Sequence, residues 1–260
     1  MKVVLSCIII SAVFITGLWS IIIPEEALIR QLEKTFEPAG LSVEVPVLKK
    51  GLFYNFTVRD MKIKRSGALL LTIDELSMSI NPLSILLWHL PVTFDGHISG
   101  GKIRGTVELL RSKGRTDITV DRANLEGMPF FSLIGLSGKG ILNGRFKTED
   151  GKGGMQLSLN DMRLGSGSFF GITIPFEMFY TARGALSVKG NVISVDSFSM
   201  EGKDIYARLK GNIYGNRMDL ILEIMKEPAF ADTYNILPLI ENYRISPGYY
   251  AIPIKNSVPL

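Results

Sequence analysis

In the segment MDLILEIM, residues 218–225, apolar side chains recur at every second position: Met218, Leu220, Leu222 and Ile224. The carboxylates Asp219 and Glu223 lie between them. A period of two, with one apolar and one polar face, is typical of an antiparallel strand that buries a single side. The segment therefore predicts an antiparallel β-sheet with one wet face and one dry face.

The sequence before this segment repeats the same pattern. Further strands are expected at 92–98, 102–110, 117–122, 140–147, 155–164, 185–189, 192–200 and 205–213. Four of these regions share a short pattern of glycine, alternating strand and glycine: GGKIRGTVEL from Gly100, GKGILNGRFK from Gly138, RGALSVKGN from Arg183 and ARLKGNIYGN from Ala207. Their spacing is irregular, so a meander of similar strands is predicted rather than a strict repeat. Gly100-Gly101 is a hairpin turn signal.

Earlier in the chain, residues 41–80 also follow a period of two, with two interruptions. Arg59-Asp60 indicates either a turn between two strands or a bulge, and Asp74-Glu75 shifts the alternation once. Two apolar stretches, residues 82–90 and 128–137, predict short helical pieces. The tail, residues 245–260, contains three prolines and is expected to form at most one edge strand.

Residues 24–40, PEEALIRQLEKTFEPAG, predict a short amphipathic helix. Pro24 suits the first helical position, and Leu28, Leu32 and Phe36 fall on one face at a spacing of four. Pro38 and Gly40 indicate where the helix stops. This helix either lies on the membrane or caps one end of the following domain, and we expect the cap.

The first apolar run, VVLSCIIISAVFITGLWSIII from Val3 to Ile23, contains no charged residue. As a helix its length would be close to the roughly 30 Å hydrocarbon core of a bilayer. A cleaved signal peptide is the alternative, but the run is long for one and no A-x-A-like site follows it. We therefore expect an uncleaved membrane anchor, with these positions along it: Val3, Ile10, Phe14, Leu18 and Ile23.

The flanks of the run favour a cytoplasmic N-terminus, because Lys2 precedes it and Glu25-Glu26 follow it. In a bacterium this places the main domain in the periplasm and the anchor in the inner membrane. The expected organisation is an anchor over 1–24, a capping helix over 25–40 and a mainly β domain over 41–260. Within that domain we expect a large, curved or groove-like antiparallel sheet with a few short helical pieces.

The chain has 260 residues, a net charge of +4 and a single cysteine, Cys7, so no intrachain disulfide can form. Basic residues crowd one stretch and are candidates for contact with lipid headgroups: Lys49, Lys50, Lys62, Lys64 and Arg65. Solvated outer faces of two strands are the alternative interpretation. Basic residues interleaved with exposed aromatic side chains would indicate nucleic-acid binding. That pattern is missing from the sequence, and no nucleic-acid partner is expected.

No residues suggest catalysis or a cofactor. His89 and His97 match no metal-ligand spacing, and Gly165-Ser166-Gly167 lacks the strand–loop–helix context of a phosphate-binding loop. We therefore expect a protein without catalytic residues, metal or cofactor. The apolar face of the sheet remains open to two interpretations, an ordinary closed core or a groove for lipid chains.

The order of these features resembles a known family. The segments INPLSILLWHLP, VTFDGHISGGKIRGTVEL, NLEGMPFF, GLSGKGILNGRF and GALSVKGNVISVDSFSMEGKDIYARLKGNIY follow an N-terminal anchor. This arrangement looks like the protein N component of the type II secretion system, and more distantly it is similar to AsmA-like envelope proteins.

The first resemblance implies a non-catalytic accessory subunit with one membrane helix and a periplasmic β domain that contacts other secretion subunits. The second implies lipid handling through an apolar groove, with an acyl chain as ligand. AsmA-like proteins are usually longer than this chain, so a groove here would be too short to bridge two membranes alone.

Overall fold

The computed structural model describes residues 24–37, 40–51, 54–81, 84, 90–108, 114–133, 136–169, 172–190, 192–215 and 217–257. In these ranges no helix is both long and apolar enough to cross a bilayer. The predicted anchor, with Val3, Ile10, Phe14, Leu18 and Ile23, lies outside the described residues. The same holds for most of the apolar stretch 82–90 and for His89.

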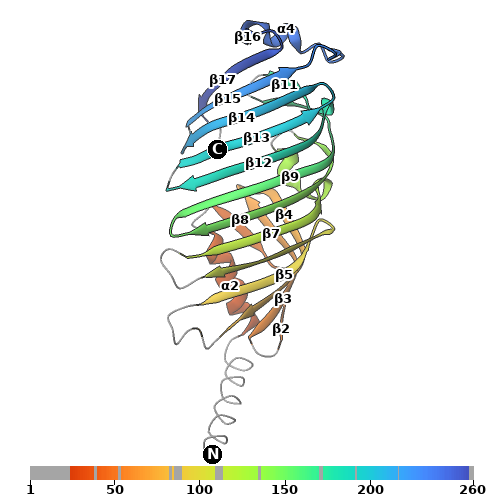
Figure 1. Cartoon of the computed structure of the whole chain (residues 1–260). Coiled ribbons are helices and arrows are strands. Elements are labelled where there is room, and N and C mark those ends of the chain that lie inside the picture. Colours follow the sequence, from red (N-terminus) through yellow and green to blue (C-terminus); the bar gives the residue numbers. More distant parts are fainter. Residues whose placement is uncertain are drawn as a thin grey trace, which may run out of the picture.

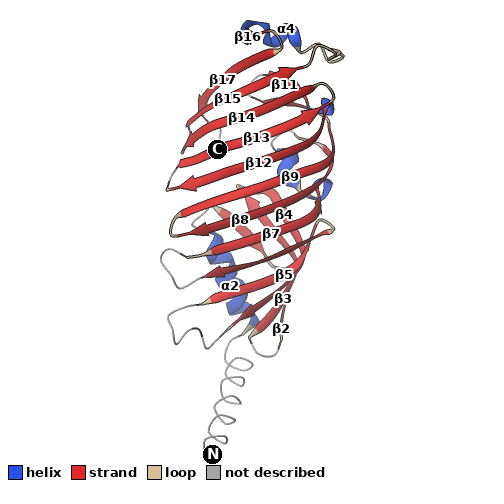
Figure 2. Cartoon of the chain, viewed as in Figure 1, coloured by secondary structure: helices blue, strands red, loops and turns tan. Residues whose placement is uncertain are grey.

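Most of the described chain belongs to one 15-stranded antiparallel sheet (Figures 1 and 2). Its strands are β1 (Leu41–Glu44), β2 (Val47–Lys50), β3 (Asn55–Arg65), β4 (Ala68–Ile80), β5 (Pro91–Ile98), β6 (Gly101–Glu108), β7 (Thr116–Asn124), β8 (Gly138–Glu149), β9 (Lys152–Leu164), β12 (Phe179–Lys189), β13 (Val192–Gly202), β14 (Ile205–Tyr214), β15 (Arg217–Lys226), β16 (Arg244–Ser246) and β17 (Tyr249–Ser257). The predicted mainly β, antiparallel architecture is confirmed.

The strands follow one another across the sheet nearly in chain order. The order departs from the chain at three places: β1 and β2 both pair with β3, β10 (Ser166–Phe169) and β11 (Ile172–Pro175) form a separate hairpin, and β17 lies between β15 and β16. The sheet is open, since none of the described pairings joins β1 or β2 to β16 or β17. In Figure 1 the strands stack along the long axis, with β2 near the N-terminal end and β16 at the opposite end.

The predicted capping helix is α2 (Glu25–Phe36), which lies at the N-terminal end of the sheet. Leu28, Ile29, Leu32 and Phe36 pack against a core formed by β1 to β7, as the helical spacing predicts. Pro24 takes the N-cap position and not the first helical position, because its ψ of 154° is extended.

A second core, formed mainly by β9 and β12 to β17, is covered by short irregular elements. These are η3 (Leu125–Gly127), α3 (Pro129–Leu133), the β10–β11 hairpin, η4 (Phe176–Met178), α4 (Leu237–Ile240) and η5 (Glu241–Tyr243). Leu125, Phe176, Ile236 and Ile240 from these elements are buried in this core. The helical piece predicted within residues 128–137 is confirmed as α3.

The tail contradicts the prediction of at most one edge strand. It forms β16 and β17, and β17 pairs with β15 from Tyr249 to Ser257. Tyr250 and Ile252 are buried and Ile254 is half-buried, so the apolar alternation continues past Pro253. A proline is tolerated here because the other edge of β17 is unpaired beyond Tyr250, so its missing N–H can face away from β15.

The structure shows what happens at the three places where the sequence interrupts the alternation or signals a turn. Arg59-Asp60 is not a turn between strands: β3 runs on through it, with Asp60 at a φ of 54°. Strand β4 is also continuous through Asp74-Glu75. The Gly100-Gly101 hairpin signal is confirmed with a shift of one residue, since Ser99 and Gly100 form the turn and Gly101 opens β6.

Candidate binding faces of the sheet

The apolar face carries one continuous row of side chains that crosses twelve strands, from β3 to β17. Residues directly opposite one another in antiparallel strands point to the same side of a sheet. Following the register from strand to strand gives Phe56, Met78, Phe94, Gly105, Ile118, Phe146, Met155, Leu186, Val195, Gly211, Leu220 and Ile254. Every member is apolar or glycine. We call this set the apolar row.

The apolar row is covered near its ends and open in its centre. Phe56 and Met78 are buried in the core beneath α2, and Val195 and Leu220 are buried near the other end. The central row, by contrast, is only half-buried: Phe94, Gly105, Ile118, Phe146, Met155 and Leu186. At about 4.8 Å between strands, these six positions span roughly 24 Å. The structure therefore leaves a long apolar surface without full cover.

Gly105 in this row makes room for a neighbouring aromatic ring. A Cβ atom added at Gly105 would lie 2.7 Å from Cζ of Phe94 and 2.4 Å from the carbonyl oxygen of Asp117. The ring of Phe94 thus lies over Gly105, where any larger residue would displace it. At this position glycine is explained by close packing across neighbouring strands.

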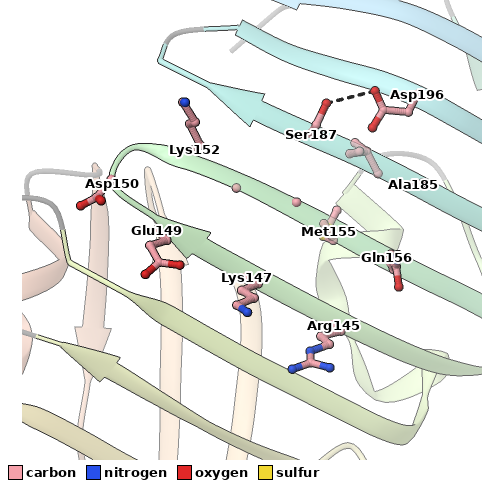
Figure 3. A pocket seen from close by; sticks show the side chains of 13 residues that line it. Arg145, Lys147, Glu149, Asp150, Lys152, Met155, Gln156, Ala185, Ser187 and Asp196 are labelled. Atoms are coloured by element: carbon pink, nitrogen blue, oxygen red, sulfur yellow. Dashed lines mark hydrogen bonds between the residues drawn. The ribbon is translucent and has the colours of Figure 1, made fainter.

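The polar face contains a hollow of about 1030 Å³ over β8, β9, β12 and β13 (Figure 3). Small residues on neighbouring strands, Gly154 and Ala185, lie among larger polar ones. Charged side chains of both signs surround them: Arg145, Lys147, Glu149, Asp150, Lys152 and Asp196. Three cations and three carboxylates give the hollow no excess charge, so it has no electrostatic preference for an anion or a cation.

Two contacts order the side chains around this hollow. Arg145 donates two hydrogen bonds to Asp117, at 3.2 Å from Nε and 2.9 Å from Nη2. The guanidinium holds the pKa of the Asp117 carboxyl below its usual value. Ser187 Oγ donates to Asp196 at 3.0 Å, as the dashed line in Figure 3 shows. These are interactions of a largely solvated surface.

The basic residues proposed for headgroup contact do not form one cluster. Lys49 and Lys50 lie on β2, opposite Thr57 and Phe56 at the start of β3. Lys62, Lys64 and Arg65 lie at the other end of β3 and pair with β1. Five or more strand residues separate the two groups, which is about 16 Å or more along the strand.

Only the first of these groups lies beside the point where the predicted anchor ends. The backbone N–H of Lys50 donates to Oε1 of Glu25 at 3.0 Å, and Glu25 directly follows Pro24. In the second group, Lys64 forms an ion pair with Glu44 across β1 and β3. Headgroup contact remains a prediction, and the structure favours Lys49 and Lys50 as its residues.

A buried carboxylate on the polar face was not expected from the sequence. The alternation in residues 218–225 predicts a solvated Glu223, yet this side chain is only 7% exposed. It accepts hydrogen bonds from Lys210 Nζ at 2.7 Å and from the Tyr249 hydroxyl at 2.9 Å. The hydrogen bond from Lys210 is the main reason why the pKa of Glu223 is lowered. Because Tyr249 comes from β17, only the folded tail reveals this contact.

The residues weighed for metal and phosphate binding fall in ordinary strand positions. His97 is exposed on β5, opposite Glu75 and Lys102, and Ser166 and Gly167 belong to β10. Throughout the described ranges, no group of three His, Cys, Asp or Glu side chains is arranged to hold a metal ion.

No family model, curated protein or solved structure matches this chain.

Proposed function

We propose that this chain is a non-catalytic accessory subunit of a type II secretion apparatus. Residues 3–23 anchor it in the bacterial inner membrane with the N-terminus in the cytoplasm, and the sheet lies in the periplasm. Its role is to bind other subunits and hold them in place. The half-buried centre of the apolar row, on an open sheet, is the observation that supports a binding role.

The physical reason is the exposure of that surface. Large contiguous apolar surfaces on soluble domains usually mark binding sites, because leaving them in water is unfavourable. Phe146, Met155 and Leu186 lie on neighbouring strands and are all half-buried. A partner that covers them gains the free energy of burying these side chains.

An acyl chain is the second candidate for the occupant of the central row. A single bilayer leaflet is about 15 Å of hydrocarbon, and a chain of that length fits along the roughly 24 Å of the central row. Met155 adds an adaptable side chain to an otherwise aliphatic and aromatic surface. This arrangement favours lipid binding in the manner that the AsmA resemblance implies.

Co-purification tests the first candidate. The full chain, tagged and expressed at its natural level, is extracted in mild detergent, and the proteins bound to it are identified by mass spectrometry. We expect secretion-apparatus subunits to co-purify with the wild-type chain and to be lost from the Phe146→Asp variant. Lys147→Asp is the matched control, since Lys147 follows Phe146 on β8 and points to the polar face. Recovery of no secretion subunit with wild type would contradict the proposal.

Lipid analysis of the same preparations tests the second candidate. Acyl chains bound to the central row should be retained by wild type and Lys147→Asp but lost from Phe146→Asp. Met155→Gln, a milder change at the residue opposite Phe146, provides a second variant if Phe146→Asp fails to fold. Equal lipid content in all folded variants would exclude the central row as a lipid site.

A further inference from the structure

Large apolar side chains are exposed at the end of the sheet farthest from α2. They lie on α4, η5, β16 and the turn before them, at the opposite end of the sheet from β2 (Figure 1). Their exposed fractions are 44% for Tyr234, 61% for Leu239, 37% for Tyr243 and 66% for Ile245. We call residues 234–245 the tip.

The tip has apolar side chains on two sides, and only one of these sides packs against the rest of the chain. Ile236 and Ile240 face inward and are buried in the core beneath α4. The carboxylate of Asp232 accepts hydrogen bonds from the backbone N–H groups of Ile236 at 2.8 Å and Leu237 at 3.0 Å. These contacts fix the start of α4, so the outward position of Leu239 is built into the fold.

The exposed apolar area of the tip is too small for a stable protein dimer, but it is sufficient for contact with the hydrocarbon of a lipid bilayer. Side chains of this size expose at most about 200 Å² each, so the four together present roughly 400 Å². A specific protein interface usually needs about 800 Å² from each partner. The tip also projects from the end of the sheet, and a projecting apolar surface can enter a bilayer without a matching cavity.

The composition of the tip fits the boundary between headgroups and acyl chains. Tyrosine is enriched at that boundary because its ring is apolar and its hydroxyl group is polar. The segment from residue 226 to residue 245 has no cationic excess, because Lys226 and Arg244 stand against Glu227, Asp232 and Glu241. Arg244 is paired with Glu241 at 2.8 Å. A neutral lipid surface is therefore favoured over an anionic one.

We propose that the tip inserts Leu239 and Ile245 into the surface of a neutral lipid bilayer, with Tyr234 and Tyr243 at the headgroup level. This inference goes beyond the proposed function, because it concerns a different surface from the apolar row. The chain then has a lipid contact at the end of the sheet opposite α2.

Vesicle capture tests the proposal. The full chain is reconstituted in nanodiscs, the nanodiscs are fixed to beads, and fluorescent phosphatidylcholine vesicles are added. We expect capture by wild type and at least a tenfold reduction for the double variant Leu239→Ser/Ile245→Ser, since each change removes exposed apolar area. Tyr214→Ser is the matched control. Tyr214 is 49% exposed and pairs with Arg217 at the start of β15, whereas the segment that carries the tip follows the end of β15. It should leave capture unchanged.

Three results would overturn the proposal. They are no capture by wild type, equal capture by the double variant, or stronger capture of phosphatidylglycerol vesicles than of phosphatidylcholine vesicles. Disulfide cross-linking of Ile245→Cys between chains in a Cys7→Ser background, without vesicle capture, would show that a second copy covers the tip instead. Phe146→Asp should still capture vesicles, which separates this surface from the one in the proposed function.

Discussion

Glu223 is buried and accepts hydrogen bonds from two other strands, from Lys210 of β14 and Tyr249 of β17, so its replacement should affect more than its own strand. Glu223→Gln replaces the ion pair with Lys210 by a hydrogen bond to a neutral amide oxygen and weakens the bond from Tyr249. We expect a loss of about 1–3 kcal/mol in the free energy of unfolding at pH 7, measured by denaturant titration. Asp219→Asn, at an exposed carboxylate of the same strand, should change stability little.

The same carboxylate predicts a pH dependence. Its pKa is lower in the folded chain than in the unfolded chain, so its stabilising contribution is complete above the unfolded value of about 4.3. That contribution is lost as the pH falls from there towards the folded value. Stability measured from pH 6 to pH 3 should therefore fall less steeply in Glu223→Gln than in wild type. Parallel curves for the two proteins would contradict this assignment.

Two glycines give a matched test of cross-strand packing. Gly105→Ala places a methyl group against the Phe94 ring and the Asp117 carbonyl, which should cost about 1–3 kcal/mol. Gly154→Ala meets its nearest neighbour, the carbonyl oxygen of Leu186, at an ordinary 3.6 Å. It should be neutral or slightly stabilising. Thermal unfolding of both variants measures the difference, and equal melting temperatures would contradict the packing argument.

Among the elements, β17 is the strand whose importance the structure changes most. Ile252 is 1% exposed, and Ile252→Ala should cost about 2–5 kcal/mol by leaving a cavity. The half-buried Ile254 provides the control, and Ile254→Ala should lose roughly half as much. If both changes were silent in denaturant unfolding, the tail would not be an integral strand of the sheet.

Periodic elements were predictable from the sequence, and the elements that depend on distant contacts were not. Residues 218–225 and the helix at Leu28, Leu32 and Phe36 show their buried face in their own spacing. Strand β16 has only three residues, and its pairing with β17 depends on a turn at Gly248, which has a positive φ. The burial of Glu223 depends on Tyr249, which is 26 residues away in the sequence.

For the candidate sites too, features set by local alternation were predictable and features set by contacts between distant residues were not. An apolar face was predictable, because alternation alone specifies it. The apolar row was not, because it depends on the register of twelve strands, including shifts at Ala185/Leu186 and Val195/Phe198. The predicted basic stretch is continuous in sequence but separates into two groups, since Lys49 lies opposite the start of β3 and Lys62 belongs to the other end of β3.

For the molecule as a whole, the membrane anchor is the proposal with the simplest test. Ile10→Arg or Phe14→Arg should cost about 3 kcal/mol of insertion free energy, because a charge is placed near the centre of the run. Membrane fractionation and a topology reporter fused after Leu260 measure the effect. Retention of both variants in the membrane with unchanged topology would mean that attachment does not depend on residues 3–23.

The nearly sequential order of strands has a consequence for how such a molecule can change. Because each strand pairs almost only with the strands next to it in the chain, two more strands could be inserted at a hairpin while the remaining register stays intact. Each such insertion would lengthen the sheet by about 10 Å. The distance between α2 and the tip is thus an adjustable quantity, set by the number of hairpins. Evolution or an engineer can tune that reach without redesigning either end.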